Sequence, residues 1–134
     1  MKKSIIISAI ALCFSVGSVQ ATPEISGSTL KLEAFYQVNS FCVSIAKGDI
    51  ETVRKLITRG ADVNEMSNGM TPAMYAAKFN RTEILELLIA HGANLKVKSD
   101  KMMTALKYAR LHGAKNTESL ILQAIADAKA KKRK

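Results

Sequence analysis

The 134-residue chain has little of what an all-β or disulfide-built protein needs. It contains no Trp, two Cys, two Pro and seven Gly, and aromatic residues make up only 5%. So few turn-forming residues argue against a sandwich with many tight turns. Hydrophobic residues at 48% and charged residues at 23% are ordinary for a folded globular domain. We therefore expect an all-α fold with a core of Leu, Ile, Val, Ala and Met.

The first 21 residues differ in character from the rest. Two lysines precede an uncharged apolar stretch at 4–19, and the segment closes on Val-Gln-Ala at 19–21. These are the parts of a secretory signal peptide, and the apolar stretch is short for a membrane span, which needs about 20 residues. An uncleaved anchor or a buried helix is the alternative. Cys13 follows a leucine, which disfavours a lipoprotein. We expect cleavage after Ala21 and a mature chain in the periplasm or outside the cell.

Export would leave the mature chain with one cysteine. Cys13 would leave with the signal, so Cys42 would have no partner for an internal disulfide. A reactive thiol is one interpretation of such a residue. We favour the other, in which Cys42 is a small buried apolar side chain.

Positive charge is concentrated at the C-terminus. The net charge is +9, and removing the two signal lysines leaves +7. A basic tail can bind nucleic acid or an acidic membrane. We expect no nucleic acid, because an exported protein seldom meets it. A solvated, frayed end is the favoured interpretation, with membrane contact as the alternative. The tail cations are Lys129, Lys131, Lys132, Arg133 and Lys134.

Two sequence blocks recur at a spacing near 33 residues. Leu-Ile-Thr-Arg-Gly-Ala-Asp-Val-Asn at 56–64 returns as Leu-Ile-Ala-His-Gly-Ala-Asn-Leu at 88–95. Thr-Pro-Ala-Met-Tyr-Ala-Ala at 71–77 returns as Thr-Ala-Leu-Lys-Tyr-Ala-Arg at 104–110. The glycines of the first pair are 32 residues apart and the threonines of the second pair are 33 apart. A period of this size indicates a stacked repeat protein.

The residues within one block predict a pair of short helices. Thr71 suits an N-cap and Pro72 the first helical position. Asn80 can adopt the left-handed conformation that ends a helix, Thr82 begins a second helix, and Gly92 ends it. Polar turn residues follow. Each unit should therefore be a helix, a turn, a second helix and a projecting polar hairpin.

The second unit resembles the ankyrin repeat. Residues 68–77 follow the family pattern G-x-T-P-L-H-x-A-A, and the glycine at 92 begins a variant of the closing G-A-D-V-N. The first unit keeps the closing motif but not the opening one. The third has Ala105 in place of Pro and lacks the closing motif, as terminal repeats often do. The resemblance covers about 39–125. It implies an ankyrin-repeat solenoid of about three helix-turn-helix units with β-hairpin-like fingers and helical caps.

These features divide the chain into segments. We expect a signal peptide at 1–21, an N-terminal segment and capping helix at 22–38, a first repeat at 39–67, a second at 68–99, a third with a C-terminal cap at 100–130, and a basic tail at 131–134.

The resemblance also implies a non-catalytic protein binder without metal or cofactor. Family members bind proteins through a concave face formed by the fingers and the inner helices. Here that face would mix apolar and basic side chains, which favours a protein partner with an acidic patch, bound by a monomer. The matching positions are Met66, Ser67, Asn68, Met70, Lys78, Phe79, Lys98, Asp100, Lys101, Met103, Leu111 and His112.

The residues argue little for other chemistry. His91 suits a helix C-terminus, and no metal-ligand spacing or glycine-rich phosphate loop is present in the sequence. We therefore expect an inhibitor, an immunity factor or an accessory protein. A host-directed effector or a membrane-surface protein is the alternative, and an enzyme is a more distant third.

Overall fold

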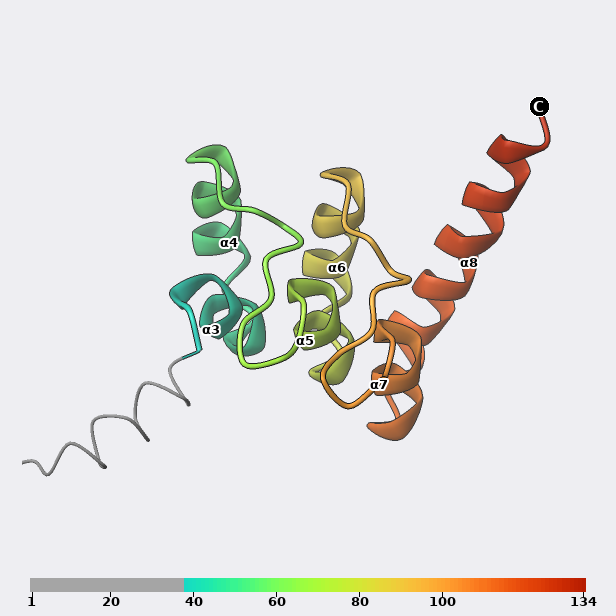
Figure 1. Ribbon diagram of the computed structural model, residues 1–134. Helices are drawn as coiled ribbons and strands as arrows, with labels where there is room; N and C mark the ends of the chain where they lie inside the picture. Colours follow the sequence, from blue (N-terminus) through green and yellow to red (C-terminus); the bar gives the residue numbers. More distant parts are fainter. Residues whose placement is uncertain (1–37) are drawn as a thin grey trace, which may run out of the picture. The chain divides into compact units, whose positions relative to one another are not determined.

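The computed structural model describes residues 38–134, where six α-helices form three pairs and no strand is present. The expected signal peptide and nearly all of the expected N-terminal cap lie outside the described residues. Figure 1 shows the pairs side by side along the chain. The helices are α3 (Ser40–Lys47), α4 (Ile50–Thr58), α5 (Pro72–Lys78), α6 (Thr82–Ala90), α7 (Ala105–Leu111) and α8 (Lys115–Lys132). None of them is long and apolar enough to cross a membrane.

The first helix of each pair begins at a polar N-cap. The Thr71 hydroxyl accepts a hydrogen bond from the Met74 amide at 3.3 Å, and Thr104 accepts one from the Lys107 amide at 3.4 Å. In the first pair the Asn39 side chain takes the same role. These bonds satisfy amides that have no partner within the helix. The expected start at Thr71 and Pro72 is confirmed.

A left-handed residue separates the two helices of every pair. Gly48, Asn80 and Gly113 have φ values of 83°, 53° and 65°. This conformation stops the first helix and turns the chain back, so the second helix can pack against the first. The sequence argument for Asn80 is confirmed.

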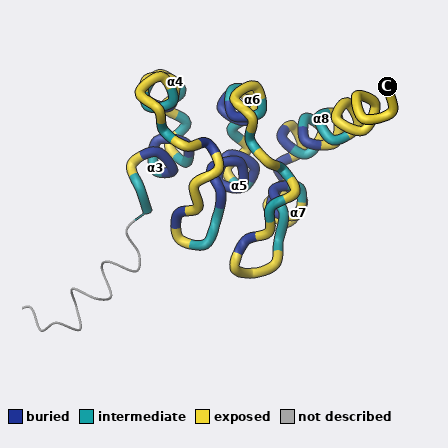
Figure 2. The backbone as a smooth tube through the Cα atoms, turned by 45° about the horizontal axis from the view of Figure 1, so that its top comes forward, coloured by how far each residue is buried: buried dark blue, intermediate teal, exposed yellow. Residues whose placement is uncertain are grey.

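The helices form two layers. Helices α3, α5 and α7 are neighbours in the inner layer, while α4, α6 and α8 are neighbours in the outer layer. The core lies between pairs, where Ile45, Met74, Leu85, Leu88 and Ile121 are almost completely buried. Figure 2 shows α5 buried along its length and the second half of α8 exposed. Burial of apolar surface between adjacent pairs therefore stabilises the stack.

The two fingers are tight turns and contain no extended strands. In the first, Ser67 and Met70 exchange backbone hydrogen bonds of 2.9 and 3.2 Å. Asn68 and Gly69 between them have φ values of 51° and 72°, as a type I′ turn requires. The expected β-hairpin-like fingers are therefore short turns, and the first of them contains one β-bridge, between Ser67 and Met70.

The second finger is one residue longer than the first. The Ser99 amide bonds to the Met103 carbonyl at 2.9 Å, and the Met102 amide bonds to the Ser99 carbonyl at 2.8 Å. Met102 is left-handed, with φ 57°. This extra residue accounts for the change of spacing in the sequence from 32 to 33.

The third pair closes the stack. At the positions where α5 and α6 carry the fully buried Ala77 and Leu85, α7 and α8 carry Arg110 and Glu118. These two form a surface ion pair of 2.8 Å. A charged pair would be costly to bury beneath another repeat, so this face is built to meet water.

Helix α8 is longer than expected. It runs for 18 residues to Lys132, so the basic tail expected at 131–134 is helical over its first two residues. The segment 124–130 is rich in alanine and contains no Gly or Pro, so nothing ends the helix earlier.

Hydrogen bonds also connect one pair to the next. Arg81 donates from Nε and Nη2 to the Ala46 carbonyl, at 3.1 and 2.9 Å. Asn64 accepts from the Asn94 amide at 2.8 Å and donates to the Gly92 carbonyl at 3.1 Å. These bonds fix the orientation of one helix pair relative to the next.

Replacing the inter-pair arginine should weaken the stack. Arg81→Met keeps much of the aliphatic stem but leaves the Ala46 carbonyl without its donor. We expect the free energy of unfolding to fall by about 1–2 kcal/mol, as measured by urea denaturation. Arg54→Met, on the exposed face of α4, is the control and should change it by less than about 0.5 kcal/mol. Equal effects of the two substitutions would contradict this role.

Candidate functional site

Most of the twelve expected contact residues reach the surface. Met70, Lys78 and Met103 are half-buried. The exposed members are Met66, Asn68, Phe79, Lys98, Asp100, Lys101, Leu111 and His112.

Ser67 is the exception. It is only 7% exposed. Its hydroxyl accepts from the Asn39 amide at 2.9 Å, and its carbonyl accepts from the Tyr75 hydroxyl at 3.1 Å. Because these bonds tie the finger to α3 and α5, Ser67 supports the surface from below. The expectation that it contacts a partner is corrected.

The remaining residues fall into two groups. The first, called here the finger group, consists of Met66, Asn68, Met70, Lys98, Asp100, Lys101 and Met103. The second, the helix-end group, consists of Lys78, Phe79, Leu111 and His112. Helix α5 separates them by about 10 Å, since it has 7 residues that each rise 1.5 Å. Residues 72–77 of α5 are all buried, so this helix offers only its end to a partner.

Met102 belongs with the finger group although the sequence reasoning missed it. Its side chain is 66% exposed. Its left-handed backbone costs about 1–2 kcal/mol for a residue other than glycine. A strained and exposed apolar residue at a turn is a sign of function. The sequence did contain a signal for Met102. The spacing between matching residues of the two units changes from 32 to 33, which marks an inserted residue in this finger.

The two fingers are held together at their tips. The Asp100 amide donates to the Gly69 carbonyl at 3.1 Å, and a side chain at position 69 would collide with the Asp100 carboxylate. The positive φ of Gly69 favours glycine, and a side chain there would also force the exposed Asp100 side chain to move. This bond places the two tips next to each other; Met66 lies just before the bridge of the first finger, and Met102 lies in the turn of the second.

Each group also contains cations. Lys98 and Lys101 flank Asp100 on the second finger. In the helix-end group, the Lys78 ammonium lies 5.3 Å from the centre of the Phe79 ring. Both groups thus combine apolar side chains with positive charge.

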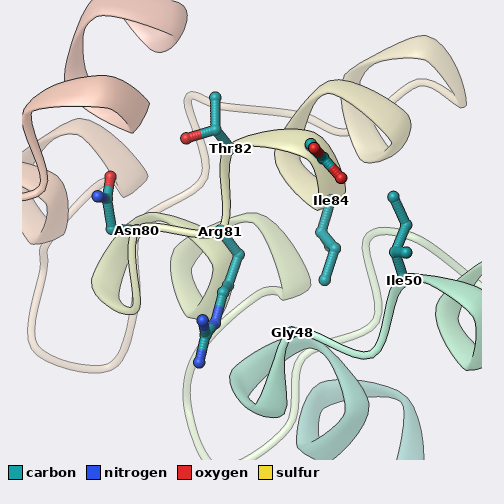
Figure 3. Close-up of a pocket in the computed structure, with 7 residues that line it drawn as sticks. Gly48, Ile50, Asn80, Arg81, Thr82 and Ile84 are labelled. Atoms are coloured by element: carbon teal, nitrogen blue, oxygen red, sulfur yellow. The ribbon is translucent and has the colours of Figure 1, made fainter.

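A hollow of about 270 Å³ lies between the first and second pairs (Figure 3). Gly48 and Ile50 line it on one side, and residues 80–84 on the other. The figure shows Arg81 reaching toward the pair that contains Gly48. Two of its nitrogens already bond to the Ala46 carbonyl. We therefore assign this hollow a structural role at the joint between pairs.

Within residues 38–134, no group of three or more His, Cys, Asp or Glu side chains is placed to hold a metal ion. Cys42 is fully buried, and burial together with the nearby Glu65 raises the pKa of its thiol to about 12. The hydrogen bond from the Thr52 side chain lowers the pKa of Asp49, which caps α4. Both residues serve the fold.

The family model described as ankyrin repeats (3 copies) matches residues 41–132. The chain belongs to the ankyrin-repeat family. Members of this family are generally non-catalytic modules that bind other proteins. Met74 stands at the His of the family's T-P-L-H motif, and its sulfur accepts from the Thr71 amide at 3.4 Å.

Ankyrin repeats of two curated proteins are similar to this chain. The ankyrin repeat, SAM and basic leucine zipper domain-containing protein 1 of Nomascus leucogenys is 37% identical over 79 residues, 58% of this chain and 16% of that protein. Myotrophin of Xenopus tropicalis is 38% identical over 55 residues, 40% of this chain and 47% of that protein. The chain thus spans less than half of either relative.

A solved structure gives a similar fold. It is a complex of a predatory endopeptidase from Bdellovibrio bacteriovorus with an immunity protein. The TM-score is 0.62 at 26% identity, over 66% of this chain and 47% of the matched chain.

The burial of Cys42 predicts a thiol that does not react in the folded state. In a Cys13→Ser variant, Cys42 is the only thiol. At pH 8 we expect a disulfide reagent to label it at least about 100-fold more slowly in buffer than in urea, because the thiolate is the reactive form. Fast labelling in buffer would restore the reactive-cysteine interpretation.

The same burial makes stability depend on alkaline pH. The pKa of the Cys42 thiol is near 9.0 in the unfolded chain and about 12 in the folded protein. The unfolded chain therefore loses this proton first as pH rises. This group should lower the free energy of unfolding by about 1.4 kcal/mol between pH 8 and pH 10. Cys42→Ala should remove this contribution to the pH dependence of the free energy of unfolding. Burial also raises the pKa of Tyr75, and the contribution of Tyr75 should remain.

Proposed function

We propose that this ankyrin-repeat protein is an exported, non-catalytic binder of another protein, which it contacts with the finger group and Met102. The observation that carries the proposal is Met102, which is both strained and exposed at the tip of the longer finger. Met66, 42% exposed, adds a second apolar side chain on the first finger. Methionine adapts its shape to a partner, so one methionine on each of the two fingers can act as an anchor.

The fingers are ordered before binding. Hydrogen bonds join Asn39 to Ser67, Tyr75 to Ser67, Tyr108 to Ser99, and the Asp100 amide to Gly69. A surface fixed in this way loses little conformational entropy when it binds. The lysines at 98 and 101 favour a partner with an acidic patch.

The role that we propose is to inhibit a partner enzyme, as an inhibitor or an immunity factor. Support comes from the similar fold in a complex that contains an immunity protein, and from the signal-like segment at 1–21. An accessory role that assembles or protects an enzyme would use the same surface.

One observation favours a second candidate function, attachment to an anionic membrane. The chain is exposed from Ala126 to its C-terminus and carries five cations there, Lys129, Lys131 and Lys132 in α8 and Arg133 and Lys134 after it. Each cation near an acidic membrane contributes about 1 kcal/mol.

Met102→Gly separates binding from stability. Glycine adopts a positive φ without strain, so the free energy of unfolding should rise by about 0.5–1 kcal/mol. Affinity for the partner, recovered one-to-one from an extract of the producing cells, should fall by about tenfold, measured by calorimetry.

Leu122→Ser is the matched control, because Leu122 is 44% exposed on α8 and lies outside the fingers. It should leave affinity unchanged. If Leu122→Ser weakens binding and Met102→Gly does not, the partner binds elsewhere. A variant that lacks residues 129–134 tests the second candidate function. If this variant loses the partner only when membranes are present, attachment to an anionic membrane is supported.

Export is tested by the N-terminus of the mature protein. We expect mass spectrometry of the protein from cell fractions to find a chain that begins at Thr22 outside the cytoplasm. A replacement of Ala21 by a bulky residue, Ala21→Leu, should slow processing. A full-length chain in the cytoplasm would rule out the periplasmic or secreted location.

A further inference from the structure

Helix α8 continues past the point at which its neighbour ends. Helix α6 has 9 residues, and the chain turns away at Gly92, whereas α8 has 18. In Figures 1 and 2 the second half of α8 extends beyond the rest of the stack. Between it and the loop that follows α6 lies a groove of about 440 Å³, called here the lysine groove.

The lysine groove has an apolar floor. Ile89 comes from α6, Leu95 from the following loop, and Ile125 from α8, and all three are half-buried. The walls include Ala93, Ala124 and Ala128, whose short side chains leave the space open. The volume lies within the range of about 300–1,000 Å³ typical of sites that enclose small ligands.

The rim of the groove is basic. Lys96, Lys129 and Lys132 line it together with Asn94, and no lining residue is acidic. Lysines at the end of α8 also favour the helix dipole, which explains two of these residues without any ligand. Lys96 has no such explanation, because it approaches from a different segment.

A second hollow between α6 and α8 differs in charge. It has a volume of about 560 Å³ and shares Ile89, Ala124 and Ala128 with the lysine groove, but its rim carries Glu86 and Asp127 with Lys131. Of these two hollows, the lysine groove is the one that combines an apolar floor with charge of one sign.

We propose that the lysine groove is a second docking site, which binds an acidic segment of a protein and takes one or two of its large apolar side chains onto the floor. The lysines attract the carboxylates, and the apolar contacts slow dissociation. A membrane fits less well, because the apolar floor is recessed and a flat bilayer surface cannot reach it. None of the lining residues belongs to the finger group, so the two surfaces share no residue.

Selection of random peptides tests the occupant without assuming its sequence. A displayed library of peptides about twelve residues long would be selected on the full-length protein. We expect enriched peptides to combine Asp or Glu with Leu, Ile or Phe, and to bind more weakly as salt rises. Enriched peptides without acidic residues would overturn the proposal.

Filling the groove should abolish this binding. Ala128→Trp places a large side chain in the groove from an exposed position, and Ala126→Trp, on the same exposed helix but outside the lining, is its control. By fluorescence anisotropy, affinity for the selected peptides should fall by about tenfold or more with the first and by less than about twofold with the second. Thermal unfolding verifies that both variants fold. Equal affinity of the two variants would overturn the proposal.

Charge reversal distinguishes this site from a polybasic tail. Lys129→Glu with Lys132→Glu should weaken peptide binding by about tenfold, whereas Arg133→Glu with Lys134→Glu should not. Met102→Gly should leave it unchanged, so failure here is distinct from failure of the finger surface. Vesicles of phosphatidylcholine with phosphatidylglycerol are the competing probe. If they displace the peptides, and the 133/134 variant weakens peptide binding as much as the 129/132 variant, the site is a membrane contact and the proposal is wrong.

Discussion

The structure depends on contact between one helix pair and the next, because no pair can bury its apolar face alone. Met74, Leu85 and Leu88 are buried in the middle pair because neighbours cover both of its sides. The same contact brings polar groups together, so Arg81 reaches the Ala46 carbonyl and Asn64 bonds across two loops. Packing and hydrogen bonding thus set one geometry, and that geometry places the fingers side by side.

In the described part of the chain, the third pair has no neighbour on its outer side, so the residues on that face differ. In the third pair, Arg110 and Glu118 replace residues that are buried in the second pair. An exposed ion pair adds little stability, but it keeps an apolar face from meeting water. The long α8 continues beyond this ion pair, and the lysine groove lies between its second half and the loop that follows α6.

Much of the fold follows from local residues. Thr71, Pro72, Asn80 and Gly92 set helix ends through their own backbone preferences, which the sequence shows directly. Exposure is harder to predict, because it depends on which neighbour covers a side chain. Ser67 lies in a polar turn and yet is buried by bonds to distant residues, while Met102 is exposed through an insertion that shifts one finger. The length of α8 depends on the absence of a helix-ending residue, and the repeat pattern does not predict this length.

The Arg110–Glu118 pair also limits how such a protein can grow. Duplicating the third unit would trap that charged pair inside the lengthened array, where its desolvation would oppose folding. Duplicating the second unit would instead set Ala77 and Leu85 against a copy of the apolar face that the second unit already packs against the first. New binding area can therefore be gained from the middle of the array, while the terminal unit stays last.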